Sequence, residues 1–283
     1  MSTRSSPQPP ADPGSLSVLQ RRITTAARIR ARTSSRLQVT IAQIVVAQLL
    51  PGGAIKGGAG MKLRLGEAFT RDSRDLDTAV REDVDTFVTD LATALQTGWG
   101  NFTGHVVPGV PPTPAGVPTG YVMRPFTIKL RYHGKAFLSL PLEIGYDELN
   151  ALGGPLEHHL ADDVATLFAE LGLPTPAPVR LLPAALQIAQ KIHACTAPGS
   201  ERAHDLVDLQ LLTPGTDDTE VAQAVQRLFA FRRAHPLPAA ITPGPGWDTR
   251  YTDAATGLEV HPTLEDAVAW TSSYLQRLAA HLS

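Results

Sequence analysis

The sequence predicts an α/β domain followed by a helical domain, and three observations support this fold class. Residues 126–132 alternate apolar and polar side chains, a pattern typical of strands, and residues 136–144 are expected to return as a second strand after a turn. A glycine-rich turn followed by two aspartates precedes those strands in the chain. After Tyr146, apolar residues recur at helical spacing in several segments.

Length and composition limit the class of protein. The 283 residues suit one large domain or two ordinary ones, and an apolar content of 43% allows a sizeable core. No apolar run approaches the ~18 residues that a membrane-spanning helix needs, and we identify no secretory signal. Because Cys195 is the only cysteine, an internal disulfide and a cysteine-rich metal site are excluded. We therefore expect a cytoplasmic protein with no membrane partner.

Charge is distributed unevenly although the net charge is only −2. Residues 1–36 hold seven arginines and one acid, whereas residues 67–90 hold eight acids. A basic arm beside an acidic site suits an enzyme that holds a polyanion near metal ions. A solvated basic helix without a partner is the alternative interpretation.

The first half of the chain is expected to alternate helices with turns and strands. Apolar spacing predicts one helix from Leu16, a second from about Ser34 to Leu50, a short third at 61–66 and a fourth at 78–96. Asp75 and Asp77 are expected on a strand. Residues 108–120, rich in proline and glycine, are expected to form a loop.

The second half is expected to be helical. Predicted helices cover 160–171, 184–197, 201–212, 219–234 and 263–282. The predicted organisation is therefore a basic N-terminal arm at 1–35, an α/β domain at 36–150 and a helical domain at 151–283.

Asp75 and Asp77 are the first candidate site residues. On a strand, side chains at positions i and i+2 point to the same face, so the two carboxylates can hold one or two hard cations. The preceding glycine turn brings backbone N–H groups close to phosphate oxygens. Glu143, on a neighbouring strand, could complete a metal cage. Alone, the aspartate pair would favour a solvated acidic turn, and the glycine turn and Glu143 shift the interpretation towards the metal site.

A second candidate cluster lies in the helical half. Lys191 is the only lysine after Lys135 and stands on a mostly apolar helix, which suits contact with a triphosphate. Asp205 and Asp208, at positions i and i+3, share one helix face. Alternatively, Arg202 and Asp205 form an i,i+3 salt bridge and Lys191 is merely exposed.

Four blocks together resemble the AbiEii/AbiGii nucleotidyltransferase toxins, and within that family the MenT toxins. In chain order the blocks are Ile55-Lys-Gly-Gly, Arg71-Asp-Ser-Arg-Asp-Leu-Asp77, Gln190-Lys-Ile-His-Ala and Arg202-Ala-His-Asp-Leu-Val-Asp-Leu-Gln210. The resemblance runs from about residue 36 to 235. It implies a DNA polymerase β-like nucleotidyltransferase domain with a mixed sheet, and the toxin half of a type IV toxin–antitoxin pair, with a cognate antitoxin as partner.

The resemblance also implies roles for individual residues. The implied catalytic residues are Asp75, Asp77, Lys191 and Asp208, with Asp208 acting as a metal ligand or as a base. The implied nucleotide-binding residues are Lys56, Gly57, Gly58, Ser73, Lys191 and Arg232, and the implied metal ligands are Asp75, Asp77 and Glu143. One position departs from the family, because Ala59 stands where serine or threonine usually follows the two glycines.

For MenT-like proteins the implied reaction is transfer of a nucleotide, commonly a pyrimidine, from an NTP to the 3′ acceptor end of tRNA, which blocks translation. The implied cofactor is Mg²⁺, with Mn²⁺ as a substitute, and residues 21–36 are our candidate contact for tRNA phosphates. Two alternatives stay open. One is a nucleotidyltransferase that modifies a protein or a small molecule, and the other is a catalytically weak binding protein of the same fold, which Ala59 favours.

Overall fold

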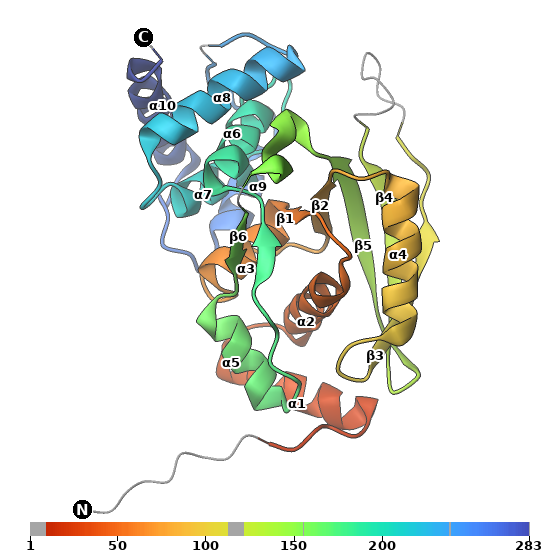
Figure 1. Cartoon of the computed structure of the whole chain (residues 1–283). Coiled ribbons are helices and arrows are strands. Elements are labelled where there is room, and N and C mark those ends of the chain that lie inside the picture. Colours follow the sequence, from red (N-terminus) through yellow and green to blue (C-terminus); the bar gives the residue numbers. More distant parts are fainter. Residues whose placement is uncertain (1–9, 113–121, 155, 238, 283) are drawn as a thin grey trace, which may run out of the picture.

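The computed structural model describes residues 10–112, 122–154, 156–237 and 239–282, and a mixed seven-stranded sheet forms its centre (Figure 1). The strands are β1 (Ala54–Lys56), β2 (Leu76–Val80), β3 (Phe102–Pro108), β4 (Arg124–Tyr132), β5 (Lys135–Tyr146), β6 (Glu157–His159) and β7 (Val179–Leu181). Their order in the sheet is β3-β4-β5-β2-β1-β7-β6. Strand β2 runs parallel to β5 and β1 runs parallel to β7, while the other neighbours are antiparallel. The predicted α/β fold with a mixed sheet is confirmed.

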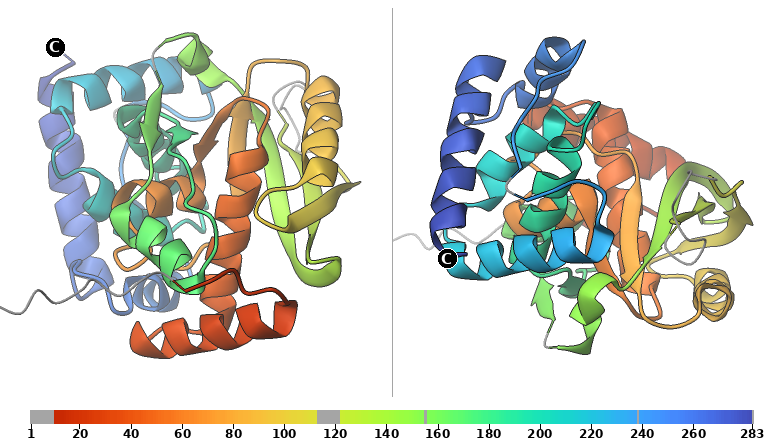
Figure 2. Two further views of the ribbon diagram at one scale, coloured as in Figure 1. Left: turned by 60° about the horizontal axis from the view of Figure 1, so that its bottom comes forward. Right: turned by 90° about the horizontal axis from the view of Figure 1, so that it is seen from above.

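The helices form two groups with separate apolar clusters. The first group packs with the sheet and consists of α1 (Leu16–Ile29), α2 (Ser34–Leu49), α4 (Val84–Thr97) and α5 (Asp162–Leu171). The second gathers at one side of the molecule (Figure 2) and consists of α6 (Ala184–Cys195), α7 (His204–Leu212), α8 (Asp218–Arg232), α9 (Trp247–Ala255) and α10 (Leu264–Ala280). Helix α3 (Gly57–Leu65) contributes Met61 to the second cluster and Leu63 to the first.

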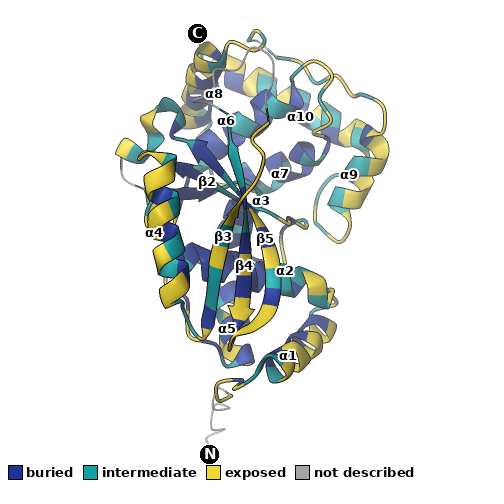
Figure 3. Ribbon diagram, turned by 90° about the vertical axis from the view of Figure 1, so that its right-hand side faces the viewer, coloured by how far each residue is buried: buried dark blue, intermediate teal, exposed yellow. Residues whose placement is uncertain are grey.

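Local sequence explains where the early helices begin and end. Ser15 caps α1 and Thr33 caps α2, each through a hydroxyl that accepts a backbone N–H of the first turn. Helix α2 is buried over most of its length, whereas α1 and α4 expose their outer surfaces (Figure 3). The two predicted helix starts near residues 16 and 34 are confirmed.

Several predicted boundaries were wrong. The helix expected at 78–96 begins only at Val84, because Leu76–Val80 form β2 and the Asp83 carboxylate then caps α4 by accepting two backbone N–H groups at 3.0 Å. The helix expected at 61–66 begins at Gly57, so the glycine turn is itself the first turn of α3. The loop expected at 108–120 begins one residue later, because Pro108 is the last residue of β3, and its residues 113–120 lie outside the described residues.

Six elements were not predicted: strands β1, β3, β6 and β7, the 3₁₀ helix Glu148–Gly153 and helix α9. The strands β6 and β7 have three residues each, too few for a period-2 pattern to appear. Strand β3 is mostly half-buried or exposed, and α9 buries only Trp247 and Tyr251. Because β6, β7 and α5 join the sheet half, residues 157–181 are not part of the second helical group. No helix in the described ranges is long and apolar enough to cross a membrane.

Several arginines of the predicted basic arm make hydrogen bonds or salt bridges with other parts of the chain. Arg22 donates to the backbone oxygens of Ala11 and Leu171 at 2.7 Å, and Arg30 pairs with Glu170 at 2.8 Å. Two further arginines hold the segment that follows α3, Arg32 through the oxygen of Ala68 and Arg36 through Glu67 and Asp72. Arg21 and Arg28 are exposed on α1.

Candidate active site

Three charged side chains stand in one row across the middle of the sheet. In the strand register, Lys56 on β1 is opposite Asp77 on β2, and Asp77 is opposite Glu143 on β5. Residues in register project to the same face of a sheet, so the three side chains are neighbours. Asp75 directly precedes β2, so only Asp77 of the pair is within the strand.

The row opens into a cleft of about 540 Å³ between the sheet and helices α6–α8. Nine of the ten predicted site residues line this cleft, and Asp208 is not among the lining residues in the described part of the chain. The nine are Lys56, Gly57, Gly58, Ser73, Asp75, Asp77, Glu143, Lys191 and Arg232. Residues separated by more than 170 positions therefore meet at one place.

Glycine is required at the first two positions of α3, because the side chains of Asp77 and Ser73 occupy the space that a Cβ atom would need. Gly57 has φ = +60°, and a Cβ there would lie 1.9 Å from the Oδ2 of Asp77. A Cβ at Gly58 would lie 2.5 Å from the Cβ of Ser73. The helix has no side-chain cap, so its first N–H groups remain free to bind an anion in the cleft. Ala59 is buried in the apolar cluster, so the family's usual hydroxyl position does not face the cleft here.

We expect Gly57→Ala to impair both folding and ligand binding. The left-handed backbone alone should cost roughly 1–2 kcal/mol of unfolding free energy, and the clash should displace the Asp77 carboxylate and weaken binding of a nucleoside triphosphate. Gly134→Ala is the matched control, because Gly134 has φ = +75° but no atom within 4 Å of an added Cβ. Denaturant titration and calorimetric binding measure the two effects. A Gly57→Ala protein that binds nucleotide as well as Gly134→Ala would contradict the assigned clash.

Buried residues hold the segment that carries Asp75. The Oγ of Ser73 donates to the Oδ1 of Asp75 at 3.0 Å. From α2, the Nε2 of Gln43 donates to the backbone oxygen of Asp75 at 2.7 Å. Lys62 in turn donates to the Oε1 of Gln43 at 2.9 Å and to the Oγ1 of Thr40 at 3.0 Å. The position of Asp75 is therefore fixed by a chain of hydrogen bonds that begins in the core.

The carboxylates have the chemistry of a site for a hard divalent cation. Asp75, Asp77 and Glu143 offer only oxygen ligands, which Mg²⁺ prefers. Burial and the adjacent charge of Asp75 raise the pKa of Asp77 to about 6, a repulsion that a bound cation would relieve. Within the described residues no group of three or more His, Cys, Asp or Glu side chains is already close enough to hold a metal ion. The oxygen ligands of Asp75, Asp77 and Glu143 therefore suit Mg²⁺. In the described residues these side chains do not yet form a complete coordination sphere.

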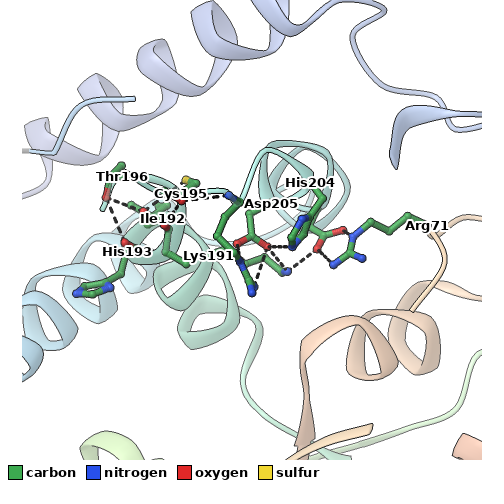
Figure 4. Close-up of polar contacts among 12 residues, drawn as sticks. Arg71, Lys191, Ile192, His193, Cys195, Thr196, His204 and Asp205 are labelled. Carbon is green, nitrogen blue, oxygen red and sulfur yellow. Dashed lines mark hydrogen bonds and ion pairs between the residues drawn. The ribbon is translucent and has the colours of Figure 1, made fainter. Parts of the chain in front are cut away.

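Lys191 is held by two buried aspartates of α7, Asp205 and Asp208, of which Figure 4 labels Asp205. Its Nζ lies 3.0 Å from the Oδ1 of Asp205 and 2.5 Å from the Oδ2 of Asp208. Arg71 reaches Asp208 with two hydrogen bonds of 2.9 Å, and Arg202 reaches Asp205 at 2.8 Å. The Arg202–Asp205 salt bridge is therefore present, but the alternative of an exposed Lys191 is wrong, because its side chain is only 6% exposed.

Electrostatics keep this network ionised. Burial alone would raise the pKa of Asp208, but the charges of Lys191 and Arg71 hold it below its usual range. The same balance, with Lys191 and Arg202 as the neighbours, lowers the pKa of Asp205. Both oxygens of Asp208 already accept hydrogen bonds, so the geometry suits a positioning residue better than a base.

Arg232 is held at the cleft by Glu148, a residue that sequence analysis missed. Its Nε and Nη2 donate to the two carboxylate oxygens of Glu148, each at 2.8 Å. The Nε2 of Gln190 donates to the same carboxylate at 2.8 Å. Glu148 lies in the short 3₁₀ segment Glu148–Gly153, where no periodic pattern marks it.

His193 should make the fold sensitive to acid. Burial and the nearby charge of Arg232 lower the pKa of His193 from 6.5 to about 4, so the folded protein binds fewer protons than the unfolded chain between these pH values. Stability is therefore lost as the pH falls through this window. Relative to His193→Gln, we expect the wild-type unfolding free energy to decrease by about 3 kcal/mol between pH 7 and pH 4. Denaturant titrations at several pH values measure the difference, and parallel pH profiles for the two proteins would contradict it.

Comparisons with known proteins give a family and a related fold. A family model described as the nucleotidyl transferase AbiEii toxin of type IV toxin–antitoxin systems matches residues 42–271. A search of curated proteins found no match. Among solved structures, the chain is similar to MenT4, a nucleotidyltransferase toxin from Mycobacterium tuberculosis H37Rv, with a TM-score of 0.55 and 16% identity. That match covers 93% of this chain and 97% of the other, and shows a shared fold.

Proposed function

Because this chain belongs to the AbiEii family of nucleotidyltransferase toxins of type IV toxin–antitoxin systems, we propose that it transfers a nucleoside monophosphate from an NTP to the 3′ end of tRNA. One observation carries the proposed transfer from an NTP: a single cleft joins the free N-terminus of α3, three carboxylates and the cations of α6 and α8. This combination suits a triphosphate and a divalent cation together. We propose a pyrimidine nucleotide as the donor.

The cleft residues divide into groups that hold the donor and groups that hold the metal ion. The N–H groups of Gly57 and Gly58 would bind triphosphate oxygens, and the charges of Lys56 and Arg232 would neutralise them. Asp75, Asp77 and Glu143 would hold Mg²⁺, or Mn²⁺ in its place, which when bound supplies positive charge for the phosphate under attack.

Two buried aspartates would hold Lys191 of α6 in position for a triphosphate. Asp205 and Asp208 hold the ammonium of Lys191 at the cleft, so that little motion is needed when a triphosphate enters. Asp208 also fixes Arg71, which lines the same cleft. We therefore assign Asp208 a positioning role.

The resemblance to the MenT group is the support for tRNA as acceptor. The basic arm adds little to it, because α1 lies away from α6 and α7 (Figure 1) and four of its arginines have contacts within the chain. With tRNA as the acceptor, we propose that the protein acts in the cytoplasm, and the family implies a cognate antitoxin that restrains it.

A labelling experiment tests the acceptor. The protein is incubated with Mg²⁺, each of the four α-labelled NTPs in turn, and total tRNA, with Asp77→Asn as the inactive control. We expect label on tRNA, strongest with CTP or UTP. Label on protein or on a small molecule instead would favour the first alternative, and no label from a folded protein would favour a binding protein of the same fold.

A further inference from the structure

Gln187 buries an amide that has no hydrogen-bond partner. The residue is 2% exposed, and neither its Nε2 nor its Oε1 has a partner among the described residues. Buried side-chain amides are nearly always hydrogen-bonded, because water otherwise solvates them better in the unfolded chain. This amide therefore indicates a missing partner, and the residue lines the cleft where a ligand would supply one.

Gln187 stands out on its own helix face. Residues 187, 190, 191 and 194 of α6 line the cleft, at the spacing of one helical face. The amide of Gln190 is bonded to Glu148, and the ammonium of Lys191 is bonded to two aspartates. Ala194 has no polar side-chain group. Within the described structure, Gln187 is therefore the polar side chain of this face that still lacks a partner.

The amide lies beside the first turn of α3. A Cβ added at Gly60 would come within 2.6 Å of the Nε2 of Gln187, so glycine leaves room for the amide there. The same turn presents the N–H groups of Gly57 and Gly58 to the cleft, without a side-chain cap. Backbone and side-chain donors thus approach one region of the cleft from two different helices.

We propose that Gln187 is a nucleotide-binding residue whose Nε2–H donates to an oxygen of the donor triphosphate. This inference rests on the proposed function for the identity of the ligand. A triphosphate suits the position because its oxygens accept hydrogen bonds from several donors at once. Its binding would satisfy the Nε2 of Gln187 and leave the Oε1 to a ribose hydroxyl or a water molecule.

Two nearly isosteric variants test the proposal by calorimetric binding of inorganic tripolyphosphate and of each NTP, both with Mg²⁺. Gln187→Met removes the donor and should weaken binding of every one of these ligands by about ten- to hundredfold. Gln187→Glu places a carboxylate against the phosphates and should weaken binding further. The melting temperature of Gln187→Met should be unchanged or higher, because the variant no longer buries an unpaired amide.

Two other glutamines serve as controls. Gln43→Met removes a buried amide whose hydrogen bonds are made, so its melting temperature should fall. Gln223 is exposed on α8, so Gln223→Met should change neither the ligand affinity nor the melting temperature.

Four outcomes would overturn the proposal: wild-type affinity in Gln187→Met, tighter binding in Gln187→Glu, weaker binding only in step with a lower melting temperature, or no tripolyphosphate binding by the wild type. Because no acceptor is present, these results are independent of tRNA labelling. A protein that binds tripolyphosphate through Gln187 but labels no acceptor would contradict the proposed function and leave the role of Gln187 supported.

Discussion

Asp208→Ala is expected to lower the free energy of unfolding by about 3–5 kcal/mol, because it leaves buried positive charge without its partner. Asp208 has no exposed surface and binds Arg71 and Lys191 together. After the substitution, Asp205 alone would compensate Lys191, and Arg71 would lose both of its hydrogen bonds to the carboxylate. Nucleotide binding should weaken as well, because both cations line the cleft.

Denaturant titration measures the loss, with Asp253→Ala as the matched control. Asp253 is exposed on α9, so its removal should change stability little. Asp208→Asn should also be strongly destabilised, since the amide keeps the volume but not the charge. If Asp208→Ala were as stable as the control, the network would not hold Lys191 in the way that the structure indicates.

Asp77→Asn is expected to reduce nucleotidyl transfer by at least about 10²–10³-fold while the protein stays folded. The carboxylate is the central member of the row Lys56, Asp77 and Glu143, and would bind the cation directly. The amide keeps the shape that contacts Gly57 but removes the charge. Stability should hold because the substitution also removes repulsion from Asp75 and Glu143.

Initial rates with α-labelled NTP, together with a thermal melt, measure this prediction. Asp90→Asn on the exposed face of α4 is the control for loss of one aspartate near the acidic segment. An Asp77→Asn protein with the transfer rate of Asp90→Asn would place the reaction elsewhere. An unfolded Asp77→Asn protein would show instead that the carboxylate supports the fold.

Periodicity predicted the long elements of this fold and failed on the short ones. Helices α2, α6 and α8 repeat apolar residues over several turns, so their ends were predicted to within about two residues. Residues 78–80 of β2 were assigned to a helix because Val80 also fits the apolar face of α4. Only pairing with β1 and β5 identifies them as part of a strand, and such pairing depends on residues far away in the sequence.

The parts of the candidate site formed by residues close together in the sequence could be predicted. The glycine turn and the Asp75–Asp77 pair are local patterns, and Glu143 followed from its place near a strand end. The partners of Arg71 and Glu148, and the position of Gln187 in the cleft, depend on how α3, α6, α7 and α8 come together. A single sequence does not contain that geometry. The one available signal for Gln187 was its spacing of four residues from Lys191 on the same helix.

The fate of the individual phosphates tests the central claim, nucleotidyl transfer in this cleft, most directly. The protein is given Mg²⁺, total tRNA and an NTP labelled either at the α- or at the γ-phosphate. We predict that α-label enters RNA, that γ-label appears only in pyrophosphate, and that Asp77→Asn and Gln187→Glu suppress both products. Entry of γ-label into the acceptor, or α-label transfer that Asp77→Asn leaves unchanged, would contradict the account.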